Sequence, residues 1–226
     1  PQHSILFDGS ALDRMLSVDL AADAWFLGVE SLVFGRAAMG EEVARGRLSD
    51  VIRIRRRGRL LLHDAVRLEG PIAAHLARPA VARGARAMAT LVHVAPDAEG
   101  SVERVRTALS TLAADPGPHN IVMPGRDPGI HVLPSRTKVV ACPQAGLLPD
   151  PWDGRIKSGH DEAVMALDAS CGRGGSPGQV EAGASAWDGM LVARILAPDG
   201  ATLRAAIVAG LHALRGGRML PRVWLC

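Results

Sequence analysis

The sequence contains no tyrosine, and aromatic residues of all kinds make up only 3% of its 226 residues. Proteins that bind single-stranded nucleic acid usually stack the bases on aromatic side chains, so this composition offers little for such a platform. The formal net charge of +3 is mild, and charge alone therefore does not require a nucleic-acid partner. Both features favour a protein as the binding partner.

Cysteines and long apolar runs are also scarce. The three cysteines, Cys142, Cys171 and Cys226, lie far apart and form no CxxC pair. This spacing favours a reducing compartment over a disulfide framework, and we expect a cytoplasmic protein. No apolar run approaches the ~20 residues that a helix needs to cross a bilayer. We therefore expect no membrane partner.

Motifs that would define a reaction are missing. Cys171 lies in the Gly-rich stretch "ASCGRGGSPG", but no motif places a histidine beside it, and the stretch lacks the ending of a nucleotide-binding loop. His63, His75, His93 and the "GHDE" of 159–162 lack the spacing of a structural metal site. We therefore predict no enzymatic activity and no tightly bound cofactor. A transient nickel contact stays open, because borderline metals accept imidazole and carboxylate ligands.

The hydrophobic pattern predicts a mainly β protein. In "LDRMLSVDL" the apolar residues from Leu12 to Leu20 share one parity, with Arg14 as the exception, which is typical of a half-buried strand. Three further stretches predict strands, including a hairpin that turns near Arg57 and Gly58. They are 25–34, interrupted at Gly28, then 50–70 with the hairpin, and 85–96; the segment 189–198 adds a strand late in the chain.

Two segments show helical spacing instead. The segment 101–114 repeats apolar residues at helical intervals, and Ser101 can cap its first turn. The segment 201–217 does the same, with Asp199 as its expected cap and Gly216-Gly217 as its stop. We therefore expect about two helices beside the strands.

The basic run "RIRRRGR", Arg53–Arg59, has two interpretations. Strand alternation places Arg53, Arg55 and Arg57 on one face and Ile52 and Ile54 on the other. A solvated strand face, on which arginine also discourages edge pairing, explains this pattern. The alternative is a basic β-rich module that binds nucleic acid through this run, and binding to phosphate would weaken steeply with salt.

The stretch "VESLVFGRAAMGEE", residues 29–42, combines a buried strand with a Gly-Arg and a Gly-Glu-Glu. Glycines of this kind can let backbone N–H groups approach phosphate, but the lysine and hydroxyl of a phosphate loop are missing and Glu41-Glu42 would repel the anion. What remains is a glycine-hinged corner of Arg36 and Glu41. It is either a contact surface or an internal salt bridge.

The region 116–160 differs from the rest of the chain. It holds eight of the fifteen prolines, the two lysines Lys138 and Lys157, and the sole asparagine. Prolines at this density prevent a regular helix or strand. The amino-acid sequence of this region also resembles the translation of an intergenic DNA repeat. We therefore predict a β-rich region with the first helix over 1–115, a flexible Pro/Gly-rich insertion over 116–163, and a C-terminal strand and helix over 164–226.

Several short motifs of the sequence together resemble the UreD (UreH) family of urease accessory proteins. They are the Phe-Asp-Gly of 7–9, Glu30, the Gly-Arg-Ala-Ala-x-Gly-Glu of 35–41, and the C-terminal "LRGGRMLPRVWLC". Family members carry a further N-terminal β portion and lack a segment like 116–163. The resemblance therefore suggests a member that is truncated at its N-terminus and carries an insertion.

The resemblance implies a mainly β fold, β-helix-like or built of stacked sheets. It also implies a non-catalytic scaffold that works with UreF and the GTPase UreG to insert nickel into apo-urease. The residues singled out on this basis fall into three groups, with the nickel ligands unknown. Asp8, Glu30, Arg36 and Glu41 are candidates for an interface or a nickel route; Gly9, Gly35 and Gly40 are structural glycines; Arg222 and Trp224 are expected to dock the C-terminus.

Overall fold

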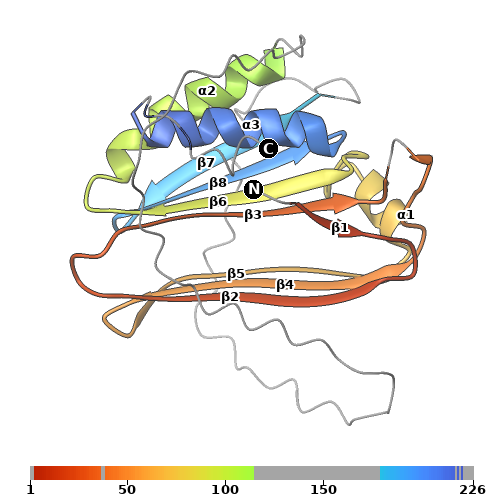
Figure 1. Cartoon of the computed structure of the whole chain (residues 1–226), viewed down its shortest axis with the longest axis horizontal. Helices are drawn as coiled ribbons and strands as arrows, with labels where there is room; N and C mark the ends of the chain where they lie inside the picture. The colour runs from red at the N-terminus through yellow and green to blue at the C-terminus, as the bar shows by residue number, and fades with distance from the viewer. Residues whose placement is uncertain (1–2, 37–38, 115–178, 217, 219, 221–226) are drawn as a thin grey trace.

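The computed structural model describes residues 3–36, 39–114, 179–216, 218 and 220. Two stacked sheets form its body, and helices α2 and α3 cover the outer face of the larger sheet (Figure 1). The five-stranded sheet has the order β1-β3-β6-β8-β7 and the three-stranded sheet the order β2-β4-β5. The elements are β1 Ser4–Leu6, β2 Ala11–Leu20, β3 Phe26–Phe34, β4 Gly46–Arg56, β5 Arg59–Gly70, α1 Ile72–Ala77, β6 Ala87–Val94, α2 Val102–Ala114, β7 Glu181–Trp187, β8 Met190–Ala197 and α3 Gly200–Leu214. The prediction of a mainly β protein is confirmed.

The first four strands alternate between the two sheets. β1 pairs in parallel with β3 in one sheet, and β2 pairs in parallel with β4 in the other. Parallel neighbours need a long crossover, and here each crossover is a strand of the opposite sheet. This part of the chain is therefore a β-helix-like coil within a pair of stacked sheets, as the resemblance implied.

The remaining strands pair antiparallel through tight turns. The predicted hairpin turn is confirmed, with Arg57 at φ 51° and Gly58 at φ 74° between β4 and β5. Asp188 at φ 51° and Gly189 at φ 68° make the same kind of turn between β7 and β8. Two consecutive positive φ values define the type I′ turn that suits the twist of a hairpin. β7 was not predicted, because its small residues give no clear alternation.

Two details of the strand prediction are wrong. Gly28 does not interrupt β3, which runs through it, and the ring of Phe26 lies over this position, 2.4 Å from where a Cβ would be. The arginines of β4 do not protect an edge, because β4 lies between β2 and β5. Arg53 and Arg55 are half-buried on the outer face, while Ile52 is buried on the inner face. The facing of the residues was predicted correctly, but the position of the strand in the sheet was not.

The two predicted helices are present, with one correction to their caps. The Asp199 carboxylate accepts a hydrogen bond from the Thr202 backbone N–H at 2.8 Å and caps α3 as expected. Ser101 instead belongs to a 3₁₀ turn before α2, and its hydroxyl accepts a hydrogen bond from Arg104 at 2.8 Å. The short helix α1 was not predicted, since six residues are too few to show a period. Among the described residues, no helix combines the length and apolar character needed to cross a membrane.

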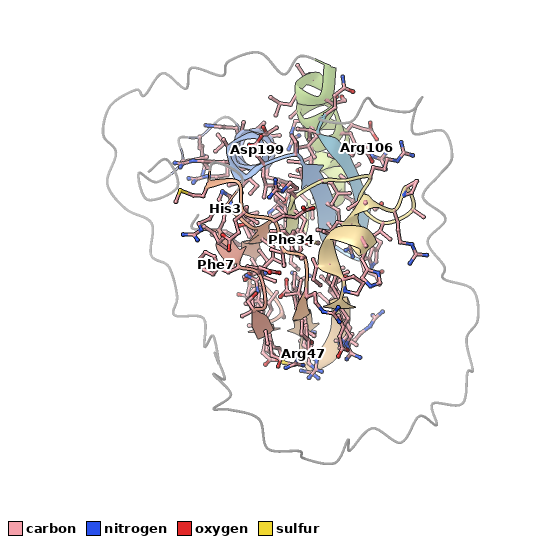
Figure 2. The ribbon with its side chains drawn as sticks, turned by 90° about the vertical axis from the view of Figure 1, so that its right-hand side faces the viewer. His3, Phe7, Phe34, Arg47, Arg106 and Asp199 are labelled. Atoms are coloured by element: carbon pink, nitrogen blue, oxygen red, sulfur yellow. The ribbon has the colours of Figure 1, made fainter. Side chains whose placement is uncertain are left out.

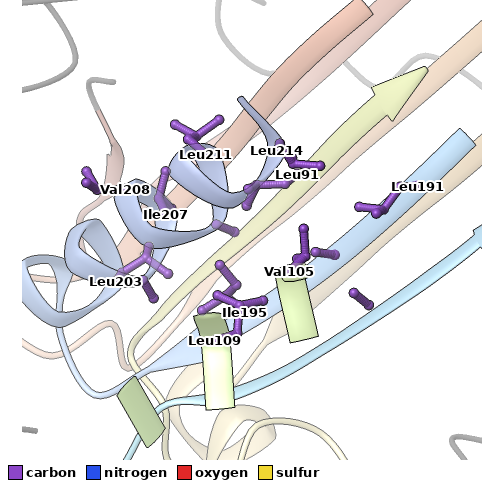
Figure 3. Close-up of a cluster of buried hydrophobic side chains, with 14 of the residues drawn as sticks. Leu91, Val105, Leu109, Leu191, Ile195, Leu203, Ile207, Val208, Leu211 and Leu214 are labelled. Atoms are coloured by element: carbon purple, nitrogen blue, oxygen red, sulfur yellow. The ribbon is translucent and has the colours of Figure 1, made fainter. Parts of the chain in front are cut away.

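The hydrophobic core has two parts, one between the helices and the larger sheet and one between the two sheets. Side chains of α2 and α3 pack on the outer face of the five-stranded sheet, and Figure 3 shows Leu109 beside Ile195 and Leu214 beside Leu91. Because β8 pairs with β6, the residues on both sides of 115–178 share this sheet. The predicted insertion itself, 116–163, lies outside the described residues.

Between the two sheets the packing is divided. One apolar cluster, which includes Leu32, Phe34 and Leu48, fills the end near α1. Another, which includes Leu16, Ile52 and Val192, fills the opposite end near the hairpin turns. Charged and polar side chains lie between these two clusters.

Candidate functional site

The predicted Arg36/Glu41 corner exists, and it contains an internal salt bridge. Arg36 Nε donates to Glu41 Oε2 at 2.7 Å, and the guanidinium of Arg36 lies 4.9 Å from the ring centre of Phe7. The Arg36 side chain stays 50% exposed, so most of its donors remain accessible. Its hydrogen bond holds the pKa of Glu41 below the usual value. The salt bridge predicted as one alternative is therefore formed, while Arg36 remains available at the surface.

Backbone contacts hold the corner in place. Gly35 donates its N–H to the carbonyl of Leu6 at 2.8 Å, and Arg86 donates to the carbonyl of Glu41. Gly35 has φ 75°, and a Cβ at this position would lie 2.5 Å from the Glu41 carbonyl oxygen. Glycine is therefore required at Gly35 by both its backbone conformation and its contact. Gly40 also has a positive φ, of 70°, but a Cβ there would meet open space.

Asp8 and Gly9 lie in the neighbouring turn. The Asp8 carboxylate accepts a hydrogen bond from the Arg45 backbone N–H at 2.9 Å, and Gly9 donates its N–H to the Arg45 carbonyl at 2.8 Å. Figure 2 views the molecule from this end and shows Phe34 nearer the middle of the stacked layers than Phe7. The structure thus brings Asp8, Arg36 and Glu41 to one end of the molecule, with the glycines as their frame.

Glu30 is not part of this corner. It lies in the middle of β3, on the face that looks toward the three-stranded sheet, and its carboxylate is 3.0 Å from Nη1 of Arg14 on β2. Arg14 also makes a forked contact with Asp50 of β4, at 2.9 Å and 2.7 Å, and donates to the Ser4 hydroxyl at 2.9 Å. One arginine therefore connects strands of both sheets.

A second ion pair crosses between the sheets nearby. Arg194 of β8 donates to Asp64 of β5 at 2.6 Å. Thr90 of β6, which is buried, is the register neighbour of both Glu30 and Arg194. Together these residues form a polar row across the middle of the molecule, which we call the ionic belt. The ionic belt consists of Ser4, Arg14, Glu30, Asp50, Asp64, Thr90 and Arg194.

Burial and neighbouring charges shift the pKa values of two residues in the belt, Glu30 and Arg14. Burial raises the pKa of Glu30, and the nearby Arg14 offsets this only in part, while the Asp50 charge raises it further. Burial alone would lower the pKa of Arg14, but the hydrogen bond to Asp50 and the charges of Glu30 and Asp50 raise it instead. A raised folded-state pKa means that ionised Glu30 is disfavoured in the fold. Its contribution to stability is therefore greatest below the ordinary pKa and falls as the pH rises through the raised value.

Most of the ionic belt was not predicted from the sequence, although a signal was present. Arg14 was noted only as the exception among apolar residues of one parity. Asp50 likewise shares its parity with Ile52 and Ile54, so it had to face the interior. A charged residue on the buried parity of a strand needs an opposite charge, but the sheet order decides which residue supplies it.

Other predicted residues can be placed only in part. Arg222 and Trp224 lie outside the described residues, as do the "GHDE" of 159–162 and all three cysteines. His63 is exposed on β5 and His93 is half-buried on β6, as expected for strand histidines. In the described ranges, no group of three or more His, Cys, Asp or Glu side chains could hold a metal ion.

The fold and the site define a protein of two stacked β-sheets, joined by ion pairs between the sheets and with an Arg36/Glu41 corner at one end. The family model described as UreD urease accessory protein matches residues 1–225. The chain therefore belongs to the UreD urease accessory protein family.

Individual relatives agree with this assignment. The chain is 39% identical over 224 residues to a urease accessory protein UreD of Methylobacterium sp. (strain 4-46), covering 99% of this chain and 57% of the relative. It is 36% identical over 224 residues to UreD of Azorhizobium caulinodans, covering 99% of this chain and 58% of the relative. For UreD of Ruegeria pomeroyi the identity is 53% over 113 residues, covering 50% of this chain and 44% of the relative. The chain thus spans a little over half the length of the first two relatives.

The corner leads to a prediction about its two glycines. Gly35→Ala should lower stability more than Gly40→Ala, because both need a positive φ, which costs an alanine about 1–2 kcal/mol, but only Gly35 would also clash with the Glu41 carbonyl. Urea unfolding of both variants measures the difference. Equal losses of unfolding free energy would show that the backbone of the corner shifts to make room for the methyl group at Gly35.

The ionic belt leads to a prediction about arginines on opposite faces of the smaller sheet. Arg14→Met should destabilise the fold by about 3–5 kcal/mol, because it leaves the buried Asp50 and the partly buried Glu30 without their cation. Arg47→Met is the matched control, because Arg47 pairs with Asp13 at a site where both side chains are nearly half exposed. Its cost should be about 0–1 kcal/mol. Similar losses in urea unfolding would contradict a structural role for the belt.

Proposed function

We propose that the chain is a non-catalytic scaffold in urease maturation, which binds apo-urease and acts with UreF and the GTPase UreG to insert nickel. The observation that carries this proposal is the family match over residues 1–225. The relatives are named accessory proteins, which fits a helper better than an enzyme. Nickel is then cargo that is passed on and not a resident cofactor. A cytoplasmic location is part of the same proposal.

The corner is the surface that best fits a protein contact. Beside the half-exposed Arg36 lie the ring of Phe7 and Met39, with exposed fractions of 43% and 72%. Protein interfaces are enriched in arginine, aromatic residues and methionine around a polar rim. Arg36 could pair with a carboxylate of the partner while Glu41 and Phe7 keep its guanidinium in place. This surface therefore supports a docking role for the corner.

Glu30 has a different part in this proposal. Its carboxylate is inside the ionic belt and paired with Arg14, so it is not available for docking at the corner. If nickel passes through this chain, Glu30 and Asp50 could contact the ion only by exchanging their contact with Arg14. We therefore assign Glu30 first to holding the sheets together and only then to a nickel route.

The proposal is tested by supplying the tagged chain to a urease-producing cell whose own UreD-family gene has been removed. We expect the chain to recover apo-urease and a UreF protein in a pull-down and to restore urease activity. A full-length relative serves as the positive control for the rest of the machinery. Recovery of neither protein, in a cell where that relative recovers both, would contradict the proposed function.

The same assay tests the corner. Arg36→Ala and Glu41→Ala should reduce urease activation several-fold, with melting temperatures close to that of the parent, because their salt bridge is half exposed and contributes little to folding. Glu103→Ala is the control, since Glu103 forms an ion pair on α2 with Arg106, whose side chain is 50% exposed like that of Arg36. Normal activation by both corner variants would limit this salt bridge to a structural role.

A further inference from the structure

The end of the molecule opposite the corner carries a hollow that the proposed function does not use. It is lined by Arg56, Arg57, Arg59, Leu61 and Asp188. The first four residues belong to the β4–β5 hairpin, and Asp188 forms the turn between β7 and β8. Both turns lie at the left of Figure 1, away from α1. The hollow is thus built where the hairpin tips of the two sheets come together.

The arginines of this hollow are poorly neutralised by the described part of the chain. Arg59 is 3.4 Å from Asp188, and the two side chains are 76% and 62% exposed. An exposed pair at this distance contributes little to stability, so an incoming carboxylate can replace Asp188. Arg57 is exposed at the hairpin tip, where its positive φ projects it beyond the strands. Arg56 Nε is buried without a hydrogen-bond partner among the described residues.

Arg56 also connects the hollow to an exposed tryptophan. Its Nη2 donates to the carbonyl of Ala24 at 3.1 Å, which holds the loop between β2 and β3 beside the hairpin. The next residue, Trp25, is 67% exposed. Tryptophan and arginine are the residues most enriched in binding hot spots. An exposed apolar side chain is thus present in the loop that Arg56 holds beside the hollow, although Trp25 does not line the hollow itself.

The nature of the partner follows from the charges around the hollow. A nucleic-acid backbone needs a continuous track of cations, whereas these arginines converge on one tip. The opposing turn is acidic, since Asp188 lines the hollow and Glu99 accepts a hydrogen bond from the Gly189 N–H at 3.0 Å. A guanidinium fork suits a single carboxylate, and Asp188 already occupies the position of such a group. A discrete carboxylate beside an apolar side chain fits this surface better than a polyphosphate chain.

We propose that this hairpin end, defined by Trp25, Arg56, Arg57, Arg59 and Asp188, is a docking site for an acidic segment of a protein partner. The carboxylates of the segment pair with Arg57 and Arg59 and displace Asp188, and an apolar side chain of the segment packs on Trp25. The site is separate from the corner, so the chain would offer one protein-binding surface at each end.

A binding experiment on the full chain tests this proposal. The probe is a fluorescein-labelled peptide of glutamates around a central leucine, followed by anisotropy, with an oligothymidylate of equal charge measured in parallel. We expect the peptide to bind more tightly than the oligothymidylate. The double variant Arg57→Glu/Arg59→Glu should bind the peptide about tenfold more weakly. The control Arg67→Glu/Arg78→Glu, which changes the net charge equally at exposed sites away from the Arg57-Gly58 turn, should bind within about twofold of the parent.

A gain-of-function variant guards against misfolding as an explanation. Asp188→Asn removes the competing carboxylate and keeps a residue that tolerates positive φ, so it should bind the peptide about threefold more tightly. Equal weakening by both arginine double variants would reveal a mere effect of net charge and overturn the proposal. Failure of the parent chain to bind the peptide would also overturn the proposal. Tighter binding of oligothymidylate that is lost in Arg57→Glu/Arg59→Glu would assign the surface to nucleic acid instead.

Discussion

The arrangement of the two sheets depends on the contacts of one side chain, Arg14. Its guanidinium reaches Asp50 within its own sheet and Glu30 and Ser4 in the other. Apolar clusters fill the space on both sides of it, but apolar packing is not directional and would accept other offsets between the sheets. A charge that can be satisfied in only one arrangement excludes those alternatives. We therefore regard the ionic belt as the feature that specifies how the sheets align, even though buried ion pairs add little net stability.

This constraint explains why the two proposed contact surfaces lie at the ends of the molecule. In the middle of the molecule the belt uses the charges of β2, β3, β4, β5 and β8 internally, and α2 and α3 cover the outer face of the larger sheet. The corner and the hairpin end are formed by turns, where backbone geometry leaves arginines exposed. The proposed scaffold role calls for separate contact surfaces, and the two surfaces that we propose lie at opposite ends of the molecule.

The strands and helices could largely be predicted from sequence, because alternation and helical spacing are local signals. The turn at Arg57-Gly58 and the Asp199 cap follow from local chemistry in the same way. The features that depend on sheet order could not be predicted. β4 looked like an edge strand but is central, and the two carboxylates that pair with Arg14 come from two different strands. Glu30 was grouped with the corner because both belong to the residues that carry the family resemblance. Along a strand, however, six residues separate Glu30 from Arg36 by about 20 Å, and they serve different parts of the structure.

The claim that the belt joins the two sheets is tested most directly by a double-mutant cycle between Arg14 and Glu30, which belong to different sheets. Unfolding free energies of the parent, Arg14→Met, Glu30→Gln and the double variant give their coupling energy. We predict a favourable coupling of about 0.5–3 kcal/mol, the range for residues that share one salt-bridge network. Additive losses, with a coupling near zero, would mean that Arg14 serves Asp50 alone and that the sheets are aligned by apolar packing.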